Sequence, residues 1–128
     1  MMPDGRHPAF LESFRYALQG LASAVRGERN LKVMLAMGAA AVVVGVVLRI
    51  DALSWAIVAL MIGAVLCAEL LNTAVETVVD LVSPQYHPLA KRAKDLAAAA
   101  ELVLCACVAV GGSVIYVRAA LALLGAGA

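Results

Sequence analysis

The sequence has little charge, few aromatic residues and few cysteines. Charged residues make up 15% of the 128 positions and aromatic residues 5%, whereas about 25% of residues in an ordinary soluble protein are charged. The formal net charge is +1, so the chain lacks the basic balance of nucleic-acid-binding domains, and we expect no nucleic-acid partner. The three cysteines all lie in apolar stretches, which gives no indication of a disulfide framework.

Aliphatic side chains are in excess. Hydrophobic residues account for 64% of the sequence, against about 45–50% in soluble proteins. They gather in three stretches without charge or proline, at residues 33–48, 52–68 and 102–117. With flanking residues, each approaches the roughly 20 residues that a helix needs to cross a bilayer. We therefore predict an all-α integral-membrane fold in a single domain, residues 1–128. Its membrane helices are expected over 31–49, 52–80 and 89–118, and residues 119–128 are expected to fray.

An amphipathic segment over residues 8–29 precedes the first apolar stretch. Its apolar side chains recur at helical spacing while polar ones fill the opposite side, which predicts a helix. We expect this helix to lie on the membrane surface. The alternative is that its apolar face packs on the membrane helices. The apolar residues are Phe10, Phe14, Ala17, Leu18, Leu21 and Val25.

The basic residues are distributed unevenly about the predicted membrane helices. Five precede the first apolar stretch and three precede the third, whereas only Arg49 and Arg118 stand at the opposite ends. By the positive-inside rule, the N-terminus and the loop of residues 81–95 face the cytoplasm. Arg49 to Asp51 then form a tight turn on the outer side, and the segment from Asp51 to Ser54 is typical of a helix start.

The second predicted membrane helix carries a polar stripe at its inner end. Glu69, Asn72, Glu76 and Asp80 are spaced i, i+3, i+7 and i+11, which places them within a sector of roughly 80°. Counted from residue 52, Glu69 lies roughly 25 Å along the helix, just inside the hydrocarbon. A charge inside the membrane costs at least about 2.5 kcal/mol, so Glu69 is a functional candidate. The alternative is a neutral carboxyl that only holds helices together.

Other charged groups converge on the same membrane depth. Glu28 comes just before the first apolar stretch, and Lys94 and Asp95 come before the third. Carboxylates at this level suit Mg²⁺, which often takes one or two carboxylates together with phosphate oxygens. Lys94 suits a phosphate group as a point charge. The glycine-rich motifs of P-loop and Rossmann nucleotide sites are absent from the sequence, so any nucleotide would be held by side chains and metal.

Two runs of this sequence, read together, resemble a known signature. They are ELLNTAVETVVD at residues 69–80 and HPLAKRAKDLAAA at residues 87–99. In this order they resemble the small prokaryotic diacylglycerol kinase and undecaprenol kinase family. The resemblance extends upstream through FRYALQG at residues 14–20 and ERN at residues 28–30, so that it covers about residues 10–117.

The resemblance implies a homotrimer in the bacterial cell membrane, with a cytoplasmic active site that transfers the γ-phosphate of MgATP to a lipid hydroxyl. It implies that Glu69 is the general base, that Asn72 is its polar partner, and that Asp80 is a further acid of the site. Glu28 and Glu76 match the ligands of the metal that bridges the ATP phosphates. The other positions that match ATP contacts are Tyr16, Gln85, Tyr86, His87, Lys94 and Asp95.

The two branches of the family differ in their acceptor lipid. The segments 28–30, 54–55 and 87–91 are more similar to the undecaprenol kinases of Gram-positive bacteria. We therefore expect undecaprenol as the acceptor, with diacylglycerol as the alternative. A proton-coupled membrane transporter is the competing class, because such proteins also bury a glutamate in the membrane; a purely structural membrane subunit is the third.

Two positions depart from the pattern of the family. Ala9 stands where the diacylglycerol branch has a basic residue, so that contact would have to come from Arg6 or Arg15, or be absent. Glu101 stands where the family has an apolar residue, on the same helix face as Lys94 and about 9 Å deeper than Asp95. We expect Glu101, near the membrane depth of Glu69, to face the bundle or the cleft that receives the lipid as a neutral acid. The alternative is an acid that faces lipid near the interface.

Overall fold

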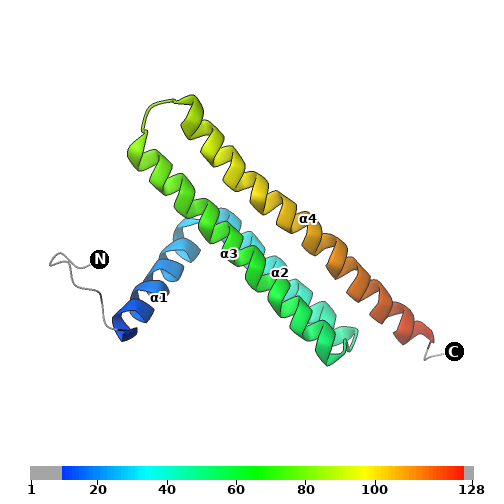
Figure 1. Ribbon diagram of the computed structural model, residues 1–128. Coiled ribbons are helices and arrows are strands. Elements are labelled where there is room, and N and C mark those ends of the chain that lie inside the picture. The colour runs from blue at the N-terminus through cyan, green and yellow to red at the C-terminus, as the bar shows by residue number, and fades with distance from the viewer. Residues whose placement is uncertain (1–9, 126–128) are drawn as a thin grey trace.

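The computed structural model describes residues 10–125, which form four helices (Figure 1). These are α1 (Phe10–Gly27), α2 (Arg29–Val47), α3 (Ala52–Val82) and α4 (Pro88–Gly125). No strand occurs among these residues, and their cysteines are free thiols. By length and composition, α2, α3 and α4 could each cross a membrane. The predicted all-α fold, with three membrane helices after an amphipathic helix, is confirmed.

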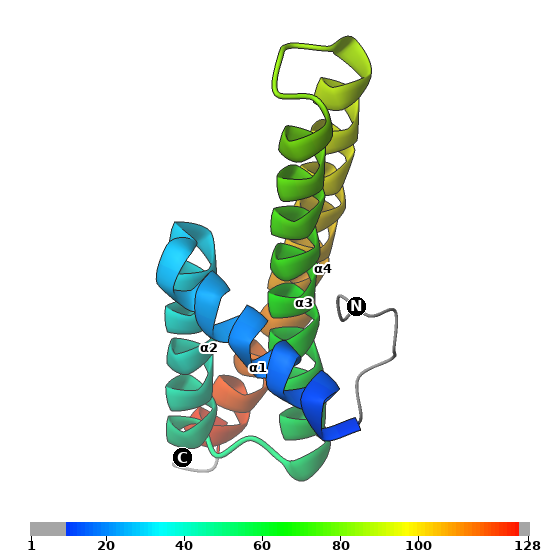
Figure 2. The same cartoon turned by 90° about the vertical axis from the view of Figure 1, so that its left-hand side faces the viewer.

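α3 is the central helix of the bundle. α4 packs antiparallel along it, α2 packs on its N-terminal half, and α1 contacts chiefly α2. The 31 residues of α3 correspond to about 46 Å at 1.5 Å per residue, whereas the hydrocarbon core is about 30 Å thick. Figure 2 shows that α3 and α4 extend together beyond the start of α2. The loop of residues 83–87 therefore reaches past the hydrocarbon.

The turn between α2 and α3 ends α2 two residues before the predicted limit of 49. The Ile50 N–H donates to the Gly45 carbonyl and the Arg49 N–H to the Val46 carbonyl, both at 3.2 Å. This pair of bonds is a Schellman motif, which requires a left-handed residue after the helix. Arg49 takes that conformation, with φ 53°. Ile50 folds back onto Gly45, so the turn is closed by an apolar contact.

α3 begins with the side-chain cap that the sequence predicts. The Asp51 carboxylate accepts hydrogen bonds from the Ser54 N–H at 3.0 Å and the Ser54 hydroxyl at 2.8 Å. The same carboxylate forms an ion pair with Arg118 of α4 at 3.0 Å. Farther into the bundle, the Tyr116 hydroxyl donates to the Ala41 carbonyl at 2.9 Å, which links α4 to α2. Polar contacts thus connect the helices at the end opposite the 83–87 loop.

The apolar interior of the described chain is small. Leu31, Ile50 and Val58 are its buried hydrophobic residues, while most large aliphatic side chains of the long helices are exposed. Such a surface suits lipid or neighbouring subunits rather than water. The apolar side of α1 is also uncovered, with Phe10 and Phe14 well exposed. Within one chain, α1 therefore does not bury its apolar face on the membrane helices, the alternative considered for it.

The segment predicted as one helix over residues 8–29 is interrupted. Glu28 has an extended backbone (φ −90°, ψ 122°), so α1 ends at Gly27 and α2 begins at Arg29. Glycine is a poor helix former, and its position at the end of α1 lowers the cost of the break. Residues 8 and 9, and with them the contact considered at Ala9, lie outside the described residues, as does Arg6.

The C-terminal helix is longer than predicted. α4 starts at Pro88 and runs to Gly125, so the prediction that the helix ends at 118 and that residues 119–128 fray is wrong as far as Gly125. Residues 119–124 are all alanine or leucine, the strongest helix formers, and they propagate the helix. α3 likewise continues two residues past the predicted limit, to Val82.

Candidate active site

The polar stripe of α3 runs from a buried to an exposed end. α3 is helical throughout residues 52–82, so Glu69, Asn72, Glu76 and Asp80 share one face, as their spacing predicts. Glu69 is 2% exposed and Asn72 8%, whereas Glu76 and Asp80 are exposed. Apart from Ser54, which donates to the N-cap residue Asp51, Glu69 and Asn72 are the buried polar residues of the described chain.

Two oxygen atoms in the buried part of the stripe have no hydrogen-bond partner. They are Oε2 of Glu69 and Oδ1 of Asn72, while Nδ2 of Asn72 donates to Oε1 of Glu76 at 3.4 Å. Buried polar atoms are nearly always hydrogen-bonded, because an unpaired one costs about 1–3 kcal/mol. These two unpaired oxygen atoms lie one turn apart on a helix long enough to cross a membrane. They therefore indicate a place where a polar group from outside the chain binds.

Acidic side chains from three parts of the chain surround Glu69. Glu28, Glu76 and Glu101 lie near enough to act electrostatically on its carboxyl group. Glu28 comes from the extended break between α1 and α2, where its side chain does not cap α2. Glu101 comes from α4, on the half-buried side that packs on α3. The fold thus brings together acids that are more than 70 positions apart in the sequence.

Within the described residues, no three acidic, histidine or cysteine side chains lie close enough together to hold a metal ion. The predicted pair of ligands, Glu28 and Glu76, is therefore not a complete site by itself. Mg²⁺ nevertheless often takes only one or two carboxylates and completes its shell with phosphate oxygens and water. The carboxylate donors present here fit Mg²⁺ that arrives with a nucleotide.

A polar pocket lies between the loop ends of α3 and α4. Its volume is about 390 Å³, and it includes Gln85, Tyr86, His87 and Lys94, four of the predicted ATP contacts. The Ser83 hydroxyl donates to the Gln85 carbonyl at 3.1 Å and closes the loop. Nδ1 of His87 accepts from the backbone at the start of α4. The other lining residues are Val79, Asp80, Ser83, Pro84, Ala90 and Lys91.

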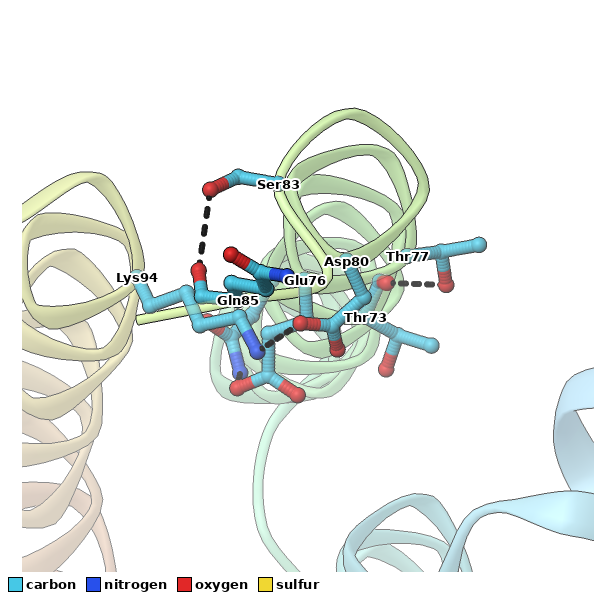
Figure 3. A network of polar contacts seen from close by, with 8 residues as sticks. Thr73, Glu76, Thr77, Asp80, Ser83, Gln85 and Lys94 are labelled. Carbon is cyan, nitrogen blue, oxygen red and sulfur yellow. Dashed lines mark hydrogen bonds and ion pairs between the residues drawn. The ribbon is translucent and has the colours of Figure 1, made fainter. Parts of the chain in front are cut away.

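The charged groups of this pocket are already paired in the chain. Figure 3 shows Lys94 of α4 reaching Asp80 of α3, with Nζ and Oδ1 at 2.6 Å, and Glu76 on the same side of α3. Lys91 pairs with Asp95 on the exposed surface of α4. Asp95 itself does not line the pocket. Sequence reasoning did not include Lys91, although its position one helical turn before Lys94 could have indicated it.

Tyr16, like Asp95, is a predicted ATP contact that does not line the pocket. It lies on α1, is 44% exposed, and its ring lies under the guanidinium of Arg15 at 5.5 Å. The pocket is lined by residues from 79 to 94 only. In one chain, therefore, the polar pocket and the buried Glu69 belong to α3 and α4, and Tyr16 stands apart from both.

Comparison with known proteins shows the family of this chain. The family model of prokaryotic diacylglycerol kinase matches residues 15–116. An undecaprenol kinase of Bacillus subtilis (strain 168) is 38% identical over 107 residues, which cover 84% of this chain and 87% of that protein. A diacylglycerol kinase of Synechocystis is 45% identical over 107 residues, or 82% of this chain and 61% of that protein. The chain belongs to the prokaryotic diacylglycerol kinase family and is a membrane lipid kinase.

Proposed function

We propose that this chain transfers the γ-phosphate of MgATP to the hydroxyl of undecaprenol at the cytoplasmic face of a bacterial membrane. The observation that carries the proposal is the buried Glu69, whose Oε2 atom lacks a partner, on the same helix face as an exposed pocket that holds Lys94. A lipid hydroxyl can approach Glu69 from the hydrocarbon side, and a nucleotide can reach the pocket from water.

The reaction needs one acceptor for the hydroxyl proton and several groups that position phosphate. In the proposed step the lipid oxygen bonds to the γ-phosphorus while the bond from that phosphorus to the bridging oxygen of ADP breaks. The hydroxyl proton passes to Glu69, and Asn72 orients the polar groups beside it. Mg²⁺ held by Glu28 and Glu76 would neutralise charge on the phosphates.

ATP is proposed to occupy the pocket formed by the 83–87 loop. When ATP binds, Lys94 leaves Asp80 and pairs with a phosphate oxygen. When the pocket is empty, Lys94 pairs with Asp80. Gln85, Tyr86 and His87 line the space around the nucleotide. Asp95 and Tyr16 are included among the proposed ATP contacts because of the family resemblance. Tyr16 would contact the nucleotide only after a movement of α1, or in the pocket of a neighbouring subunit.

A homotrimer is proposed as the working form. The proposal is supported by the small interior of the single chain, in which most aliphatic side chains of the long helices are exposed. Cross-linking of the purified protein tests it, because a trimer gives a ladder that ends at three subunits. A ladder that ends at one or two subunits would contradict it.

The choice of acceptor is supported by the undecaprenol kinase of Bacillus subtilis, which matches nearly its full length. Diacylglycerol remains the second candidate because the diacylglycerol kinase of Synechocystis has the higher identity over the same number of residues. Both lipids present one hydroxyl at the polar boundary of the membrane, so the site chemistry is shared.

The test is phosphate transfer by the purified protein in detergent, with MgATP and equal mole fractions of undecaprenol or diacylglycerol. We expect a higher kcat/KM for undecaprenol, and a loss of about 10²–10⁴-fold in kcat for Glu69→Gln. A higher kcat/KM for diacylglycerol would move the acceptor to the second candidate. A protein that phosphorylates neither lipid would overturn the kinase proposal and leave the transporter or the structural subunit.

A further inference from the structure

Glu101 lies opposite the polar stripe of α3. Two contacts between α3 and α4 fix the register of these antiparallel helices, one before Glu101 along α4 and one after it. Lys94 pairs with Asp80, and Met61 lies against Gly111. Glu101 follows Lys94 by seven positions and precedes Gly111 by ten. Because both helices rise about 1.5 Å per residue, Glu101 faces the turn that follows Glu69.

The contact between the two acids agrees with this register. The Glu101 side chain is half-buried, on a helix that packs along α3, and its carboxyl group lies near enough to that of Glu69 to act on it electrostatically. A hydrogen bond between two carboxyl groups requires a shared proton, since two carboxylates offer only acceptors. Because Glu69 accepts the hydroxyl proton in the proposed step, Glu101 is the donor in such a bond.

The two oxygen atoms of Glu69 differ in their surroundings. Oε2 is buried and has no partner, whereas Oε1 is not among the unpaired buried atoms. A glutamate has three side-chain torsions and several rotamers, so an otherwise unsupported carboxyl would sample several orientations. A hydrogen bond to Glu101, which lies opposite the next turn of α3, would restrain that freedom.

We infer that Glu101 is a positioning residue, whose hydrogen bond to Glu69 holds the unpartnered Oε2 atom where the hydroxyl of the acceptor lipid binds. Glu101 itself touches neither the lipid nor the phosphate. The inference rests on the proposed function, because it assigns to Glu69 the proton of the lipid hydroxyl. It differs from a purely structural role, in which the carboxyl pair would only join α4 to α3.

The experiment compares Glu101→Gln and Glu101→Val with the unaltered protein, in detergent with MgATP and undecaprenol. Glutamine keeps a donor for the Glu69 carboxyl, whereas valine removes it at similar volume. We expect kcat for Glu101→Val to fall about 10- to 100-fold, the loss that a misplaced catalytic group causes, while the KM for MgATP changes less than about twofold. Glu101→Gln should keep kcat within about threefold.

Matched controls separate positioning from folding. Leu102 is the neighbouring residue of α4 and is 70% exposed, so Leu102→Ala should leave kcat unchanged. Gel filtration in detergent reports whether each variant is folded, and Glu101→Met replaces Glu101→Val if the valine variant aggregates. In a Glu69→Gln background, Glu101→Val should cause no further loss, since a positioning residue acts only through the group that it positions.

The outcomes are distinguishable from failure of the proposed function. If the unaltered protein transfers no phosphate to either lipid, the kinase proposal fails. If it is active and Glu101→Val is equally active, the positioning role fails alone. A Glu101→Gln variant that loses as much kcat as Glu101→Val also overturns the inference, because charge rather than a hydrogen-bond donor would then be required. An equal additional loss in the Glu69→Gln background would indicate a separate role for Glu101.

Discussion

Lys94 and Asp80 form an ion pair across α3 and α4, with 2.6 Å between Nζ and Oδ1 (Figure 3). The Lys94 side chain is 33% exposed and that of Asp80 65%. Pairs with this much exposure contribute little net stability, because water screens them. The pair therefore holds an ammonium group at the edge of the polar pocket and can open at small cost when a phosphate competes.

Replacement of Lys94 should weaken nucleotide binding more than the chemical step. A hydrogen bond to a charged group contributes about 1.5–3 kcal/mol, so Lys94→Met should raise the KM for MgATP about 10- to 100-fold. Steady-state kinetics with varied MgATP measures it. Arg92→Met is the matched control, since it removes a nearby cation that does not line the pocket. Equal KM values for the two variants would contradict a phosphate contact by Lys94.

The proposed magnesium ligands predict a changed dependence on Mg²⁺. Even loss of an outer-shell partner weakens metal binding about 10- to 100-fold, so Glu28→Gln and Glu76→Gln should each raise the half-saturating Mg²⁺ concentration at least about tenfold. The measurement is kcat against free Mg²⁺ at fixed ATP, with removal of activity by a chelator. Glu12→Gln, an acid near the start of α1, should leave this concentration unchanged. An unchanged Mg²⁺ dependence in both stripe variants would remove these residues from the metal site.

The cap of α3 predicts a pH-dependent stability. Hydrogen bonds from the Ser54 N–H and hydroxyl, and then the charge of Arg118, hold the pKa of Asp51 below its ordinary value of 3.8. A carboxyl whose pKa falls on folding stabilises the protein above its unfolded pKa and loses that contribution as the pH drops through the folded pKa. Asp51→Ala should therefore lower the melting temperature at pH 7, and the difference should shrink below pH 3.8.

Thermal unfolding of the purified protein, followed by circular dichroism, measures this difference at each pH. Asp51→Asn is the control, because asparagine also caps helices but does not titrate in this range. Its melting temperature should lie between those of the other two proteins at pH 7. A difference between Asp51→Ala and the unaltered protein that is as large at pH 3 as at pH 7 would exclude the charged cap.

Gly45 predicts a packing limit at the turn between α2 and α3. A Cβ atom at this position would lie 2.9 Å from Cη2 of Trp55 and 3.1 Å from Cδ1 of Ile50. Overpacking of this kind costs about 1–3 kcal/mol, which exceeds the gain of about 1 kcal/mol from alanine in a helix. Gly45→Ala should therefore lower the melting temperature in detergent.

Gly20→Ala is the control for the Gly45 substitution. A Cβ atom at Gly20 would have no neighbour within 4 Å, so alanine there should only improve helix propensity. We expect the melting temperature of this variant to be equal to or above that of the unaltered protein. If Gly45→Ala is as stable as Gly20→Ala, the side chains of Trp55 and Ile50 move aside and the turn imposes no packing limit.

Much of this protein could be predicted from the order of its residues. The lengths of the apolar stretches predict three membrane helices, because a fixed rise per residue must match the hydrocarbon thickness. The spacing of Glu69, Asn72, Glu76 and Asp80 predicts one polar stripe, because all four belong to one uninterrupted helix. Both are properties of a single helix, and the helical repeat determines them locally.

Helix limits were predicted less well. Glu28 interrupts a periodic pattern without a proline, and α4 continues through a run of alanine and leucine where fraying is predicted. In the first case the tertiary fold requires a change of direction between α1 and α2. In the second, local propensity alone is sufficient once the helix has started.

The contacts that make a site were decided by the tertiary structure. The pairing of Lys94 with Asp80 and the proximity of Glu101 to Glu69 depend on how α4 is rotated and shifted along α3. The periodicity within each helix says which residues share a face, but it does not say which residue of the next helix lies opposite them. That register follows from side-chain packing along the whole α3–α4 contact, a property of two helices together.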